Sequence, residues 1–312
     1  MSQEPESSET RATPPLHCGL IAVVGRASVG KSTFVNAVFE EKVSIVSDIP
    51  QTTRTLVRGI LTEPRGQLVL LDTPGVHKAE YDLGRLMNRV ARASVEGVDA
   101  VLLMLDASTS PRIEDDGWIR RLLRETVPVL AVLNKSDVPQ GHADEYRKLW
   151  ETIAAEKQST KTAEWVEISA RTRDGVDQLV SRLFELLPPG PLLFPAEMLT
   201  DHPRKINMAD IIREKYFGKL QDELPHSLAI EVETVEEKPD EWIVHGTILV
   251  ERSSQKGIVI GHKGRLLRRV CESAGRELSE MYGIPVTLDL WVKVEKDWTK
   301  NFWILKRLGY AG

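Results

Sequence analysis

The sequence predicts an α/β fold: a doubly wound, mostly parallel sheet joined to a second, smaller α+β domain. Over the first two-thirds of the chain, short apolar runs alternate with longer amphipathic segments. Apolar runs without polar alternation are typical of strands that are covered on both faces, as in a parallel sheet. A proline-rich stretch then interrupts the pattern, and the order of helices and strands changes beyond it. At roughly 150 residues per domain, the length of 312 residues predicts about two domains.

The composition is ordinary for a globular protein and excludes several other classes. Charged residues make up 28% and hydrophobic residues 41%, which argues against collagen-like and largely disordered proteins. The two cysteines, Cys18 and Cys271, lie far apart and have no histidine at metal-ligand spacing, so neither a disulfide scaffold nor a zinc ribbon is expected. No apolar run reaches the roughly 18 residues that a membrane span needs. We therefore expect a cytoplasmic protein, and a monomer because coiled-coil heptads are lacking.

The chain divides into four parts. Residues 1–15 carry acidic and small polar side chains without an apolar core, so we expect a mobile tail rather than a secretory signal. The first domain should span residues 16–187. Residues 188–203 contain five prolines, too many for a helix or a central strand, and predict a stiff, extended connector. The second domain should span residues 204–312.

The first domain should contain strands at its apolar runs and helices between them. The runs occupy residues 16–24, 66–72, 99–106, 127–134 and 164–169. Candidate helices follow Lys31, Tyr81, Glu114, Ala143 and Asp174. Residues 56–63 precede the run at 66–72 with only a short turn between them, which predicts an antiparallel hairpin and one reversed edge. Helices should cover both faces of this sheet.

The second domain should follow the order α-β-β-α-α-β, with an added C-terminal helix. We expect a first helix over Pro203–Leu224, then strands at residues 228–236 and 241–251. A basic segment leads to a helix over Leu266–Tyr282, a strand at residues 286–294 and a last helix after Asp297. Although the net charge of the chain is -5, Arg252–Val270 holds six basic residues and no acidic one. Local charge decides what a surface attracts, so this stretch is a candidate for binding polyanions.

A phosphate-binding loop follows the first strand. Gly25–Ser32 reads GRASVGKS and fits G-x-x-x-x-G-K-[ST]. In such a loop the backbone wraps phosphate oxygens, Lys31 reaches the β- and γ-phosphates, and the Ser32 hydroxyl binds Mg²⁺. The alternative, a chance match in a glycine-rich turn, is disfavoured by the strand-turn-helix context. The candidate cradle residues are Gly25, Arg26, Ala27, Ser28, Val29, Gly30, Lys31, Ser32 and Thr33.

A second box, DTPG, stands at the end of the 66–72 run. The Asp72 carboxylate can hold Mg²⁺ through water, and the Gly75 N–H can sense the γ-phosphate. Thr73 and Pro74 complete the box. The alternative is a simple Asp-Thr-Pro-Gly turn without a function. The presence of a phosphate-binding loop in the same chain argues against this alternative.

Two further boxes predict a guanine site. Asp137, in the NKSD run that ends the 127–134 strand, can accept hydrogen bonds from the N1 and N2 donors of guanine, which adenine lacks. Asn134 should brace the loop, and the Lys135 stem should lie against the base. Ser169 and Ala170 follow the next strand, and the Ala170 N–H should meet the guanine O6. Taken singly, each box could be only a helix cap or a turn. Ligands bind at the carboxyl ends of the strands in such sheets, so the order of the boxes and their places at strand ends favour a base site.

Together, the four boxes resemble the translation-factor-like class of GTPases. The runs QTTR, FPAEMLTDHP, VIGHKG and LWVKVEKDW narrow the resemblance, which covers residues 17–312, to the Era family of bacterial GTPases. The resemblance implies GTP hydrolysis, with Lys31, Thr53 and Gly75 acting on the γ-phosphate. It also implies that Ser32, Thr53 and Asp72 hold Mg²⁺. Thr53 is preferred over its neighbour Thr52 because related boxes place the threonine directly before arginine.

The chain departs from related patterns at two positions. Val76 follows DTPG and cannot orient a water molecule as glutamine does in many signalling GTPases, so slow intrinsic hydrolysis is expected. Many relatives have Pro-Asn where this chain has Ala27-Ser28. That asparagine is associated with a potassium site, so Ser28 puts K⁺ dependence in doubt.

The C-terminal part carries a G-x-x-G loop, Gly261 to Gly264. In a KH domain such a loop joins two helices and lets a sugar-phosphate backbone lie against it, with Lys263 attracting phosphate. The order of elements resembles the type II KH arrangement. Ile258, Val259 and Ile260 should wall an apolar groove for bases. The remaining candidate RNA-binding residues are His262, Arg265, Arg268 and Arg269. For the three arginines, a solvated helix face is the alternative.

We expect five aromatic residues to pack the final helix against the sheet, with stacking platforms for bases as the alternative: Trp291, Trp298, Phe302, Trp303 and Tyr310. By resemblance, the RNA is the 3′ end of 16S ribosomal RNA, and the function is assembly of the 30S ribosomal subunit. GTP would order Ser47–Thr55 and Asp72–Glu80, and hydrolysis would release them. The alternative is that the C-terminal domain binds another protein, which would make the chain a signalling switch or a switch at the inner face of the cell membrane. An ATPase is excluded by Asp137.

Overall fold

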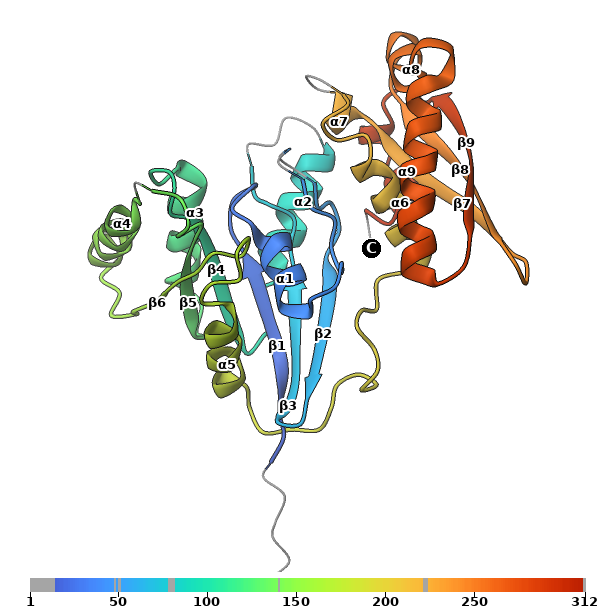
Figure 1. The fold of residues 1–312 in the computed structure, drawn as a ribbon. Helices are drawn as coiled ribbons and strands as arrows, with labels where there is room; N and C mark the ends of the chain where they lie inside the picture. Colours follow the sequence, from blue (N-terminus) through green and yellow to red (C-terminus); the bar gives the residue numbers. More distant parts are fainter. Residues whose placement is uncertain are drawn as a thin grey trace, which may run out of the picture.

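The computed structural model describes residues 15–47, 49, 52–77, 82–139, 141–220 and 224–310. It confirms an α/β fold with a second, smaller α+β unit (Figure 1). The predicted mobile tail lies almost wholly outside these residues, as do parts of the two switch segments, Ser47–Thr55 and Asp72–Glu80. Within the described parts of the chain, no helix combines the length and the apolar character needed to cross a membrane.

The first domain is built on a six-stranded sheet in the order β2-β3-β1-β4-β5-β6. Only β2 runs antiparallel, paired with β3 as the predicted hairpin, and the other pairs are parallel. The strands are β1 (His17–Val24), β2 (Val57–Glu63), β3 (Gly66–Asp72), β4 (Ala100–Asp106), β5 (Val129–Asn134) and β6 (Glu164–Glu167). The helices are α1 (Lys31–Phe39), α2 (Asp82–Ala93), α3 (Ile113–Leu122), α4 (Ala143–Glu156) and α5 (Val176–Leu186).

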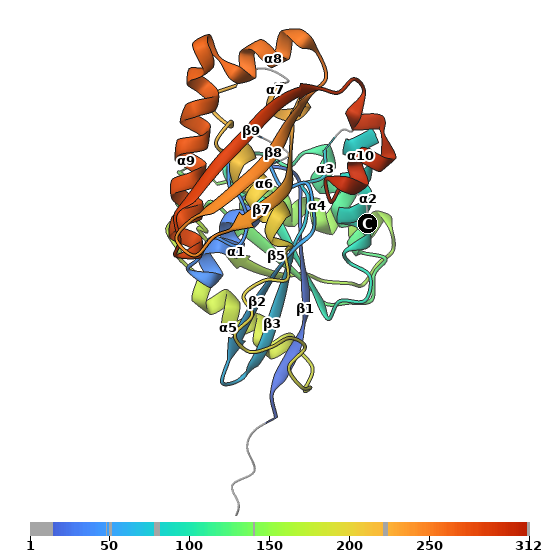
Figure 2. The same ribbon diagram turned by 90° about the vertical axis from the view of Figure 1, so that its right-hand side faces the viewer.

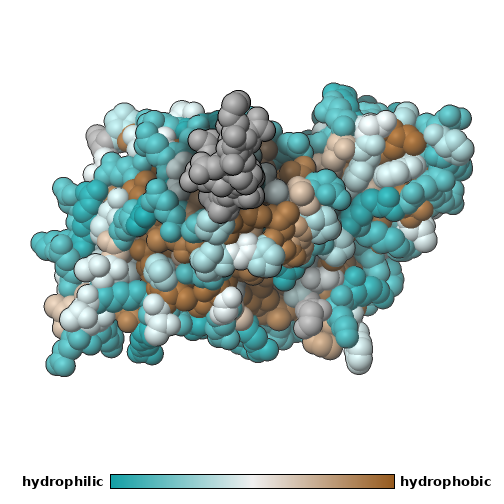
Figure 3. All heavy atoms as spheres, turned by 90° about the horizontal axis from the view of Figure 1, so that it is seen from below, coloured by the Kyte–Doolittle hydropathy of each residue, from teal (hydrophilic) through white to brown (hydrophobic). Residues whose placement is uncertain are grey.

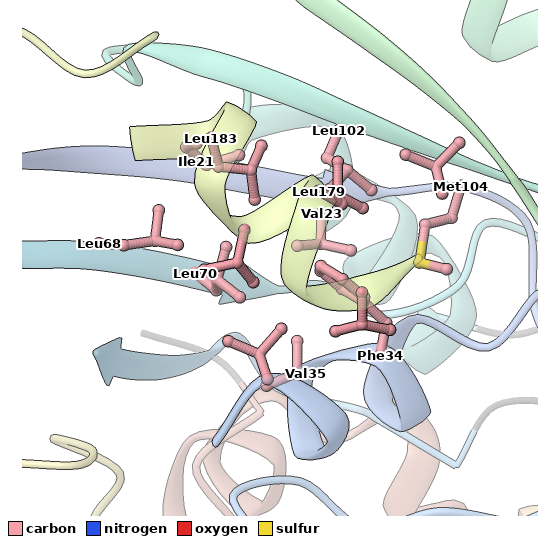
Figure 4. Close-up of a cluster of buried hydrophobic side chains, with 14 of the residues drawn as sticks. Ile21, Val23, Phe34, Val35, Leu68, Leu70, Leu102, Met104, Leu179 and Leu183 are labelled. Carbon is pink, nitrogen blue, oxygen red and sulfur yellow. The ribbon is translucent and has the colours of Figure 1, made fainter. Parts of the chain in front are cut away.

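Helices cover both faces of this sheet, so β1, β3, β4 and β5 are almost entirely buried. On one face, α1 and α5 contribute Phe34 and Leu183 to a core that contains alternate residues of the central strands (Figure 4). On the other face, α2, α3 and α4 pack around Trp118 and Tyr146. These two cores fix the carboxyl ends of the strands, from which the functional loops emerge.

The proline-rich connector lies outside the helices and strands and is tied to the first domain. The side chain of Gln67 accepts hydrogen bonds from the backbone N–H groups of Leu193 and Phe194 at 2.8 Å. The backbone N–H of Ile60 donates to the Leu199 carbonyl at 2.8 Å. The connector passes below the sheet and then rises beside β2 (Figure 1). Seen from below, apolar residues form an area bordered by hydrophilic ones (Figure 3).

The second domain has a three-stranded sheet in the order β7-β8-β9, with α6 and α9 packed on one face. Its strands are β7 (Ala229–Glu237), β8 (Trp242–Val250) and β9 (Val286–Val294). Its helices are α6 (Arg204–Glu214), α7 (Leu224–Ser227), α8 (Ser253–Ile260), α9 (Arg265–Tyr282) and α10 (Phe302–Arg307), with short 3-10 turns at η1 (His262–Gly264) and η2 (Trp298–Lys300). The predicted order α-β-β-α-α-β is present, and α10 lies on the other side of the sheet beside α2 (Figure 2).

One predicted helix is too long. The helix expected over Pro203–Leu224 ends at Glu214 and is followed by turns at residues 215–219, and a separate helix, α7, begins at Leu224. Gly218, whose φ is 73°, stands in these turns in the left-handed region. Such a conformation is incompatible with a continuing α-helix, so the segment makes two short helices instead of one.

Candidate functional site

The phosphate loop lies between β1 and α1, at the carboxyl edge of the first sheet. Lys31 is buried, and its Nζ donates to the carbonyl oxygens of Gly25 at 3.3 Å and Arg26 at 2.9 Å. Burial lowers the pKa of Lys31 to about 8. A bound phosphate would favour the charged amine, because a nearby negative charge raises the pKa of a cation. Gly30 has φ 97°, and a Cβ there would collide with the Asn134 amide.

Three oxygen-bearing side chains meet beside this loop. The Ser32 Oγ lies 2.8 Å from the Thr53 Oγ1 and donates to the Asp72 Oδ2 at 2.7 Å. The other carboxylate oxygen of Asp72 is buried and has no hydrogen-bond partner among the described residues, and burial raises the pKa of Asp72. Hydroxyl and carboxylate oxygens are the ligands that Mg²⁺ prefers. An orphaned carboxylate oxygen in such a cluster fits a divalent cation.

The two candidate switch threonines point to different partners. Thr53 faces Ser32, whereas the Thr52 Oγ1 donates to the Ile49 carbonyl at 2.6 Å. This geometry favours Thr53 over Thr52 as the residue beside the cation. Thr33 and Ser28 line the same hollow from the phosphate loop.

The base boxes are held together through Asn134. Its Nδ2 donates to the Val29 carbonyl at 2.8 Å, and its Oδ1 accepts from the Ala170 N–H at 2.9 Å. Asn134 thus braces the phosphate loop against the loop after β6, as its predicted role requires. The Ala170 N–H was expected to meet the guanine O6. In this structure it is directed at Asn134 instead, because that amide is anchored beside it.

The Asp137 carboxylate stands at the mouth of the base pocket. Its two oxygens accept from the Ser169 Oγ at 2.6 Å and from Arg171 at 2.5 Å. The hydrogen bond from Ser169 lowers the pKa of Asp137, so the group is an anion near neutral pH. Each carboxylate oxygen has a second acceptor site, so the hydrogen bonds to Ser169 and Arg171 leave sites for a base. The pocket has a volume of about 460 Å³ and is continuous with the phosphate hollow through Ser28 and Gly30.

Several residues of the predicted set point their side chains away from the hollow. The buried Arg26 guanidinium pairs with Asp115 at 3.2 Å and Asp106 at 3.3 Å, so only its backbone faces a phosphate. The Thr73 hydroxyl donates to the Val23 carbonyl at 2.7 Å and holds the loop to β1. The Val29 side chain belongs to the core.

Gly75 lies against the phosphate loop. A Cβ at this position would approach the Ala27 Cα to 2.5 Å. The next residue, Val76, donates its backbone N–H to the Gly25 carbonyl and accepts from the Ala27 N–H, both at 3.3 Å. This direct contact joins the DTPG box, with its buried Pro74, to the phosphate loop.

Sequence reasoning missed Asp106. It ends β4 beside Asn134 in the sheet register, and its Oδ2 accepts from the Lys135 Nζ at 2.8 Å. The Lys135 side chain, which lines the base pocket, is therefore held in place by Asp106. A carboxylate at the end of the neighbouring strand was the signal that could have identified this residue.

The G-x-x-G loop joins α8 to α9 at the top of the second domain (Figures 1 and 2). Lys263 has φ 51°, and Gly261 and Gly264 also have positive φ, so the backbone turns sharply. His262, Lys263, Arg265, Arg268 and Arg269 are all exposed. Arg268 has one ion pair, with Glu272 at 3.8 Å, and stands in the exposed stripe that its helical spacing predicts.

The expected apolar wall is only partly present. Ile258 is 51% exposed, Ile260 is half-buried, and Val259 is fully buried in the core of the domain. Val259 therefore cannot wall a groove, because α8 turns it toward α9 and the sheet. Ile258 and Ile260 remain as candidates.

The prediction for the C-terminal aromatic residues is right for two and wrong for three. Trp298 and Tyr310 are buried where α10 packs on the sheet and on α2. Trp291, Phe302 and Trp303 are 72%, 57% and 74% exposed. Trp291 points outward because the alternation of β9 places it on the sheet face that is opposite to α9. Phe302 and Trp303 occupy the outer side of the short helix α10.

Comparison with known families agrees with this architecture. Residues 20–135 match a family described as 50S ribosome-binding GTPase, and residues 223–299 match the KH domain family. The chain is 42% identical to the GTPase Era of Geobacter metallireducens over 299 residues, covering 95% of this chain and 99% of that protein. It is 40% identical to the GTPase Era of a Thermoanaerobacter strain over 296 residues, covering 94% and 96%.

Solved structures are similar over the same extent. One is an Era variant from Aquifex aeolicus bound to GDP and AlF4⁻, and another is Era in complex with MgGDPNP and nucleotides 1506–1542 of 16S ribosomal RNA. Each is 35% identical to this chain, with a TM-score of 0.87, and covers 95% of this chain and 100% of the known one.

Proposed function

Because this chain belongs to the Era family of GTPases, we propose that it binds the 3′ end of 16S ribosomal RNA and assists assembly of the 30S subunit as a GTP-driven switch. The chain is a GTPase that binds GTP, GDP and Mg²⁺. One observation carries the RNA part of the proposal. The exposed basic G-x-x-G loop lies in a KH domain, and a relative of the same domain organisation is known in complex with this RNA.

We propose the following division of labour at the nucleotide. The Lys31 amine binds β- and γ-phosphate oxygens and stabilises the charge that develops as water displaces the γ-phosphate. Ser32, Thr53 and Asp72 would hold Mg²⁺, which neutralises phosphate charge when it is bound. The Gly75 N–H contacts the γ-phosphate. Since Val76 offers no polar group to orient the attacking water, intrinsic hydrolysis is slow.

Guanine selection is assigned to the loops at the ends of β5 and β6. Asp137 accepts from the N1 and N2 donors of the base, and Lys135 lies along it while held by Asp106. Ser169 orients the Asp137 carboxylate. The backbone N–H of Ala170 contacts the base by donating to the guanine O6 as well as to the Asn134 Oδ1. Ser28 supplies no long polar side chain for a K⁺ site, so K⁺ stimulation is not expected.

We assign residues 16–187 to the GTPase domain, residues 188–203 to the connector and residues 204–312 to the RNA-binding domain. In the last of these, the RNA backbone lies along Gly261–Gly264, with Ile258 and Ile260 beside the bases. The basic side chains of the loop and of α9 bind phosphates; they are His262, Lys263, Arg265, Arg268 and Arg269. The protein acts in the cytoplasm as a monomer.

The best test of RNA binding is a substitution at Gly264. A Cβ at Gly261 would approach the Leu266 Cβ to 2.6 Å, so a variant there would disturb α9. At Gly264 no atom lies within 4 Å of an added Cβ. We expect Gly264→Asp to weaken binding of a 16S 3′-end oligonucleotide by roughly tenfold or more, because a carboxylate repels the RNA backbone. Filter binding measures the change.

Gly283 provides a matched control. It ends α9 with φ 68°, close to the 75° of Gly264, and it also has no atom within 4 Å of an added Cβ. Gly283→Asp therefore adds the same charge with similar backbone strain at the other end of the helix. Equal RNA binding by the two variants would contradict the proposal.

A peripheral contact with a membrane is a second candidate, favoured by the exposed Trp291, Phe302 and Trp303. Aromatic side chains with nearby lysines are typical of membrane-surface contacts, and Lys293 and Lys306 are exposed in the same segment. Co-sedimentation with anionic lipid vesicles tests this contact. Binding that persists after Trp303→Ala would exclude Trp303 as its anchor.

A further inference from the structure

The residue that follows Thr53 is buried in the second domain. Only 2% of Arg54 is exposed. Its guanidinium donates at 2.9–3.3 Å to three backbone carbonyls, those of Pro225, His226 and Leu228. Two aromatic rings also lie 5.6–5.9 Å from it, those of Tyr310 and Trp298. A side chain of the first switch segment is therefore part of the interior of the KH domain.

The residue that precedes Thr53 is also held by the second domain. Arg213, at the end of α6, is 1% exposed and donates to the Thr52 carbonyl at 2.5 Å. The same guanidinium nitrogen donates to Asp210 at 2.8 Å, which fixes its orientation. Both peptide neighbours of Thr53 are thus attached to the KH domain.

Burying two charged side chains is an energetically unfavourable way to hold two domains together. Arg54 and Arg213 are two buried cations, and burial together with the neighbouring Arg213 lowers the pKa of Arg54 to about 10. Buried charges usually add little net stability, and apolar residues of similar size would hold an interface as well. Unlike apolar side chains, guanidinium groups donate hydrogen bonds in fixed directions, so they fix the positions of the backbone carbonyls that they bind.

The residues that precede this segment are also attached to the KH domain. The Ile45 side chain belongs to its core, and the Val46 N–H donates to Glu214 at 3.2 Å. Lys42 pairs with Glu214 at 2.5 Å and with Glu277. Contacts with α6 and α9 therefore begin well before Thr52.

From these contacts we infer that Arg213 and Arg54 are positioning residues for GTP hydrolysis: they clamp the backbone on both sides of Thr53 and aim its hydroxyl at the Mg²⁺ site. The Thr53 Oγ1 lies 2.8 Å from the Ser32 Oγ, so a small shift of its backbone would remove it from the cation. The KH domain thereby supplies part of the GTP-specific site. This inference rests on the proposed GTPase function.

The test compares Arg213→Gln with Lys42→Gln in the full chain. Lys42→Gln removes contacts between the domains but leaves Thr52 and Arg54 untouched, so it controls for a looser domain contact. We expect R213Q to weaken binding of a GTP analogue with Mg²⁺ by roughly tenfold, the effect of losing one charged hydrogen bond, with GDP affinity unchanged. The Mg²⁺ concentration for half-maximal hydrolysis should rise as well, and K42Q should change neither quantity.

Arg213→Lys is a second variant that can be measured if R213Q does not fold. Lysine keeps the charge and its N–H donors, but its side chain is one bond shorter than that of arginine and lacks the planar fork. It therefore reaches the Thr52 carbonyl and Asp210 less well, and a smaller shift in the same direction is expected. A purely structural role predicts a lower melting temperature with an unchanged ratio of GTP-analogue to GDP affinity, and that result overturns the clamp. Wild-type protein that binds no GTP analogue would overturn the proposed function together with the clamp.

Discussion

The nucleotide site consists of buried side chains that hold one another, whereas the G-x-x-G site consists of exposed side chains with few partners. Lys31, Asp72 and Asn134 are nearly inaccessible to solvent. Asp72 and Asn134 are each positioned by a group from another loop, and Lys31 is positioned by carbonyls of its own loop. Arg268 is 82% exposed at its side chain and has one long ion pair. The first site is pre-organised before any ligand arrives. The second depends on many similar and weak contacts with phosphates.

This difference predicts how each site responds to substitution. A buried and interlocked site should fail when one group is removed, because that group has no substitute and its partners lose their orientation. An exposed basic surface should lose affinity gradually, because each cation contributes a small and salt-dependent part of the binding free energy. Three substitutions test this contrast, beginning with the largest effect.

Lys31→Ala should reduce the rate of GTP hydrolysis by roughly a hundredfold or more, since one preorganised group that stabilises transition-state charge is worth about that much. Release of inorganic phosphate measures the rate. Lys161 is the matched control, because its Nζ also caps backbone carbonyls, those of Leu122, Glu125 and Val127, far from the nucleotide. If Lys161→Ala lowers the rate as much, loss of stability rather than loss of the phosphate contact explains the effect.

Asp137→Asn should move the base preference from guanine toward xanthine by roughly ten- to a hundredfold, the range expected when a buried hydrogen bond is left unpaired. An amide can donate to the C2 oxygen of xanthine, where guanine carries an amino group. Competition between GTP and XTP for the protein measures the preference. Asp177→Asn, at an exposed carboxylate that pairs with Arg173, should leave it unchanged. Preference for guanine that survives D137N would disprove the assignment of Asp137.

The sequence predicted the parts of both sites that depend on local geometry. The spacing from Gly25 to Ser32 reflects what one loop needs to surround a phosphate, and Asn134 follows a strand whose carboxyl end faces the ligand edge of the sheet. The exposed stripe of Arg265, Arg268 and Arg269 needs only helical periodicity. Such features require no knowledge of what lies far away in the chain.

The parts that it failed to predict depend on distant partners. Nothing near Arg26 indicates that its side chain turns to Asp115, and nothing near Arg54 indicates the carbonyls of α7. Trp303 resembles a packing residue until the position of α10 is known. The early end of α6 is a different case, because Gly218 was visible in the sequence and marks a turn.

The smallest expected effect is at the exposed surface. Arg268→Gln should weaken binding of the 16S 3′-end oligonucleotide by roughly two- to threefold and lower the salt slope by about 0.7, as expected for one lost contact with a single-stranded phosphate. Arg276 is an exposed arginine on the same helix, about 12 Å further along it at 1.5 Å per residue, so R276Q makes the same charge change away from the loop. Binding measured across a salt series separates the two variants. Equal salt slopes for R268Q and R276Q would mean that α9 attracts RNA only through its overall charge. A hundredfold loss of RNA affinity in R268Q would mean that the side chains of the KH surface depend on one another as those of the nucleotide site do.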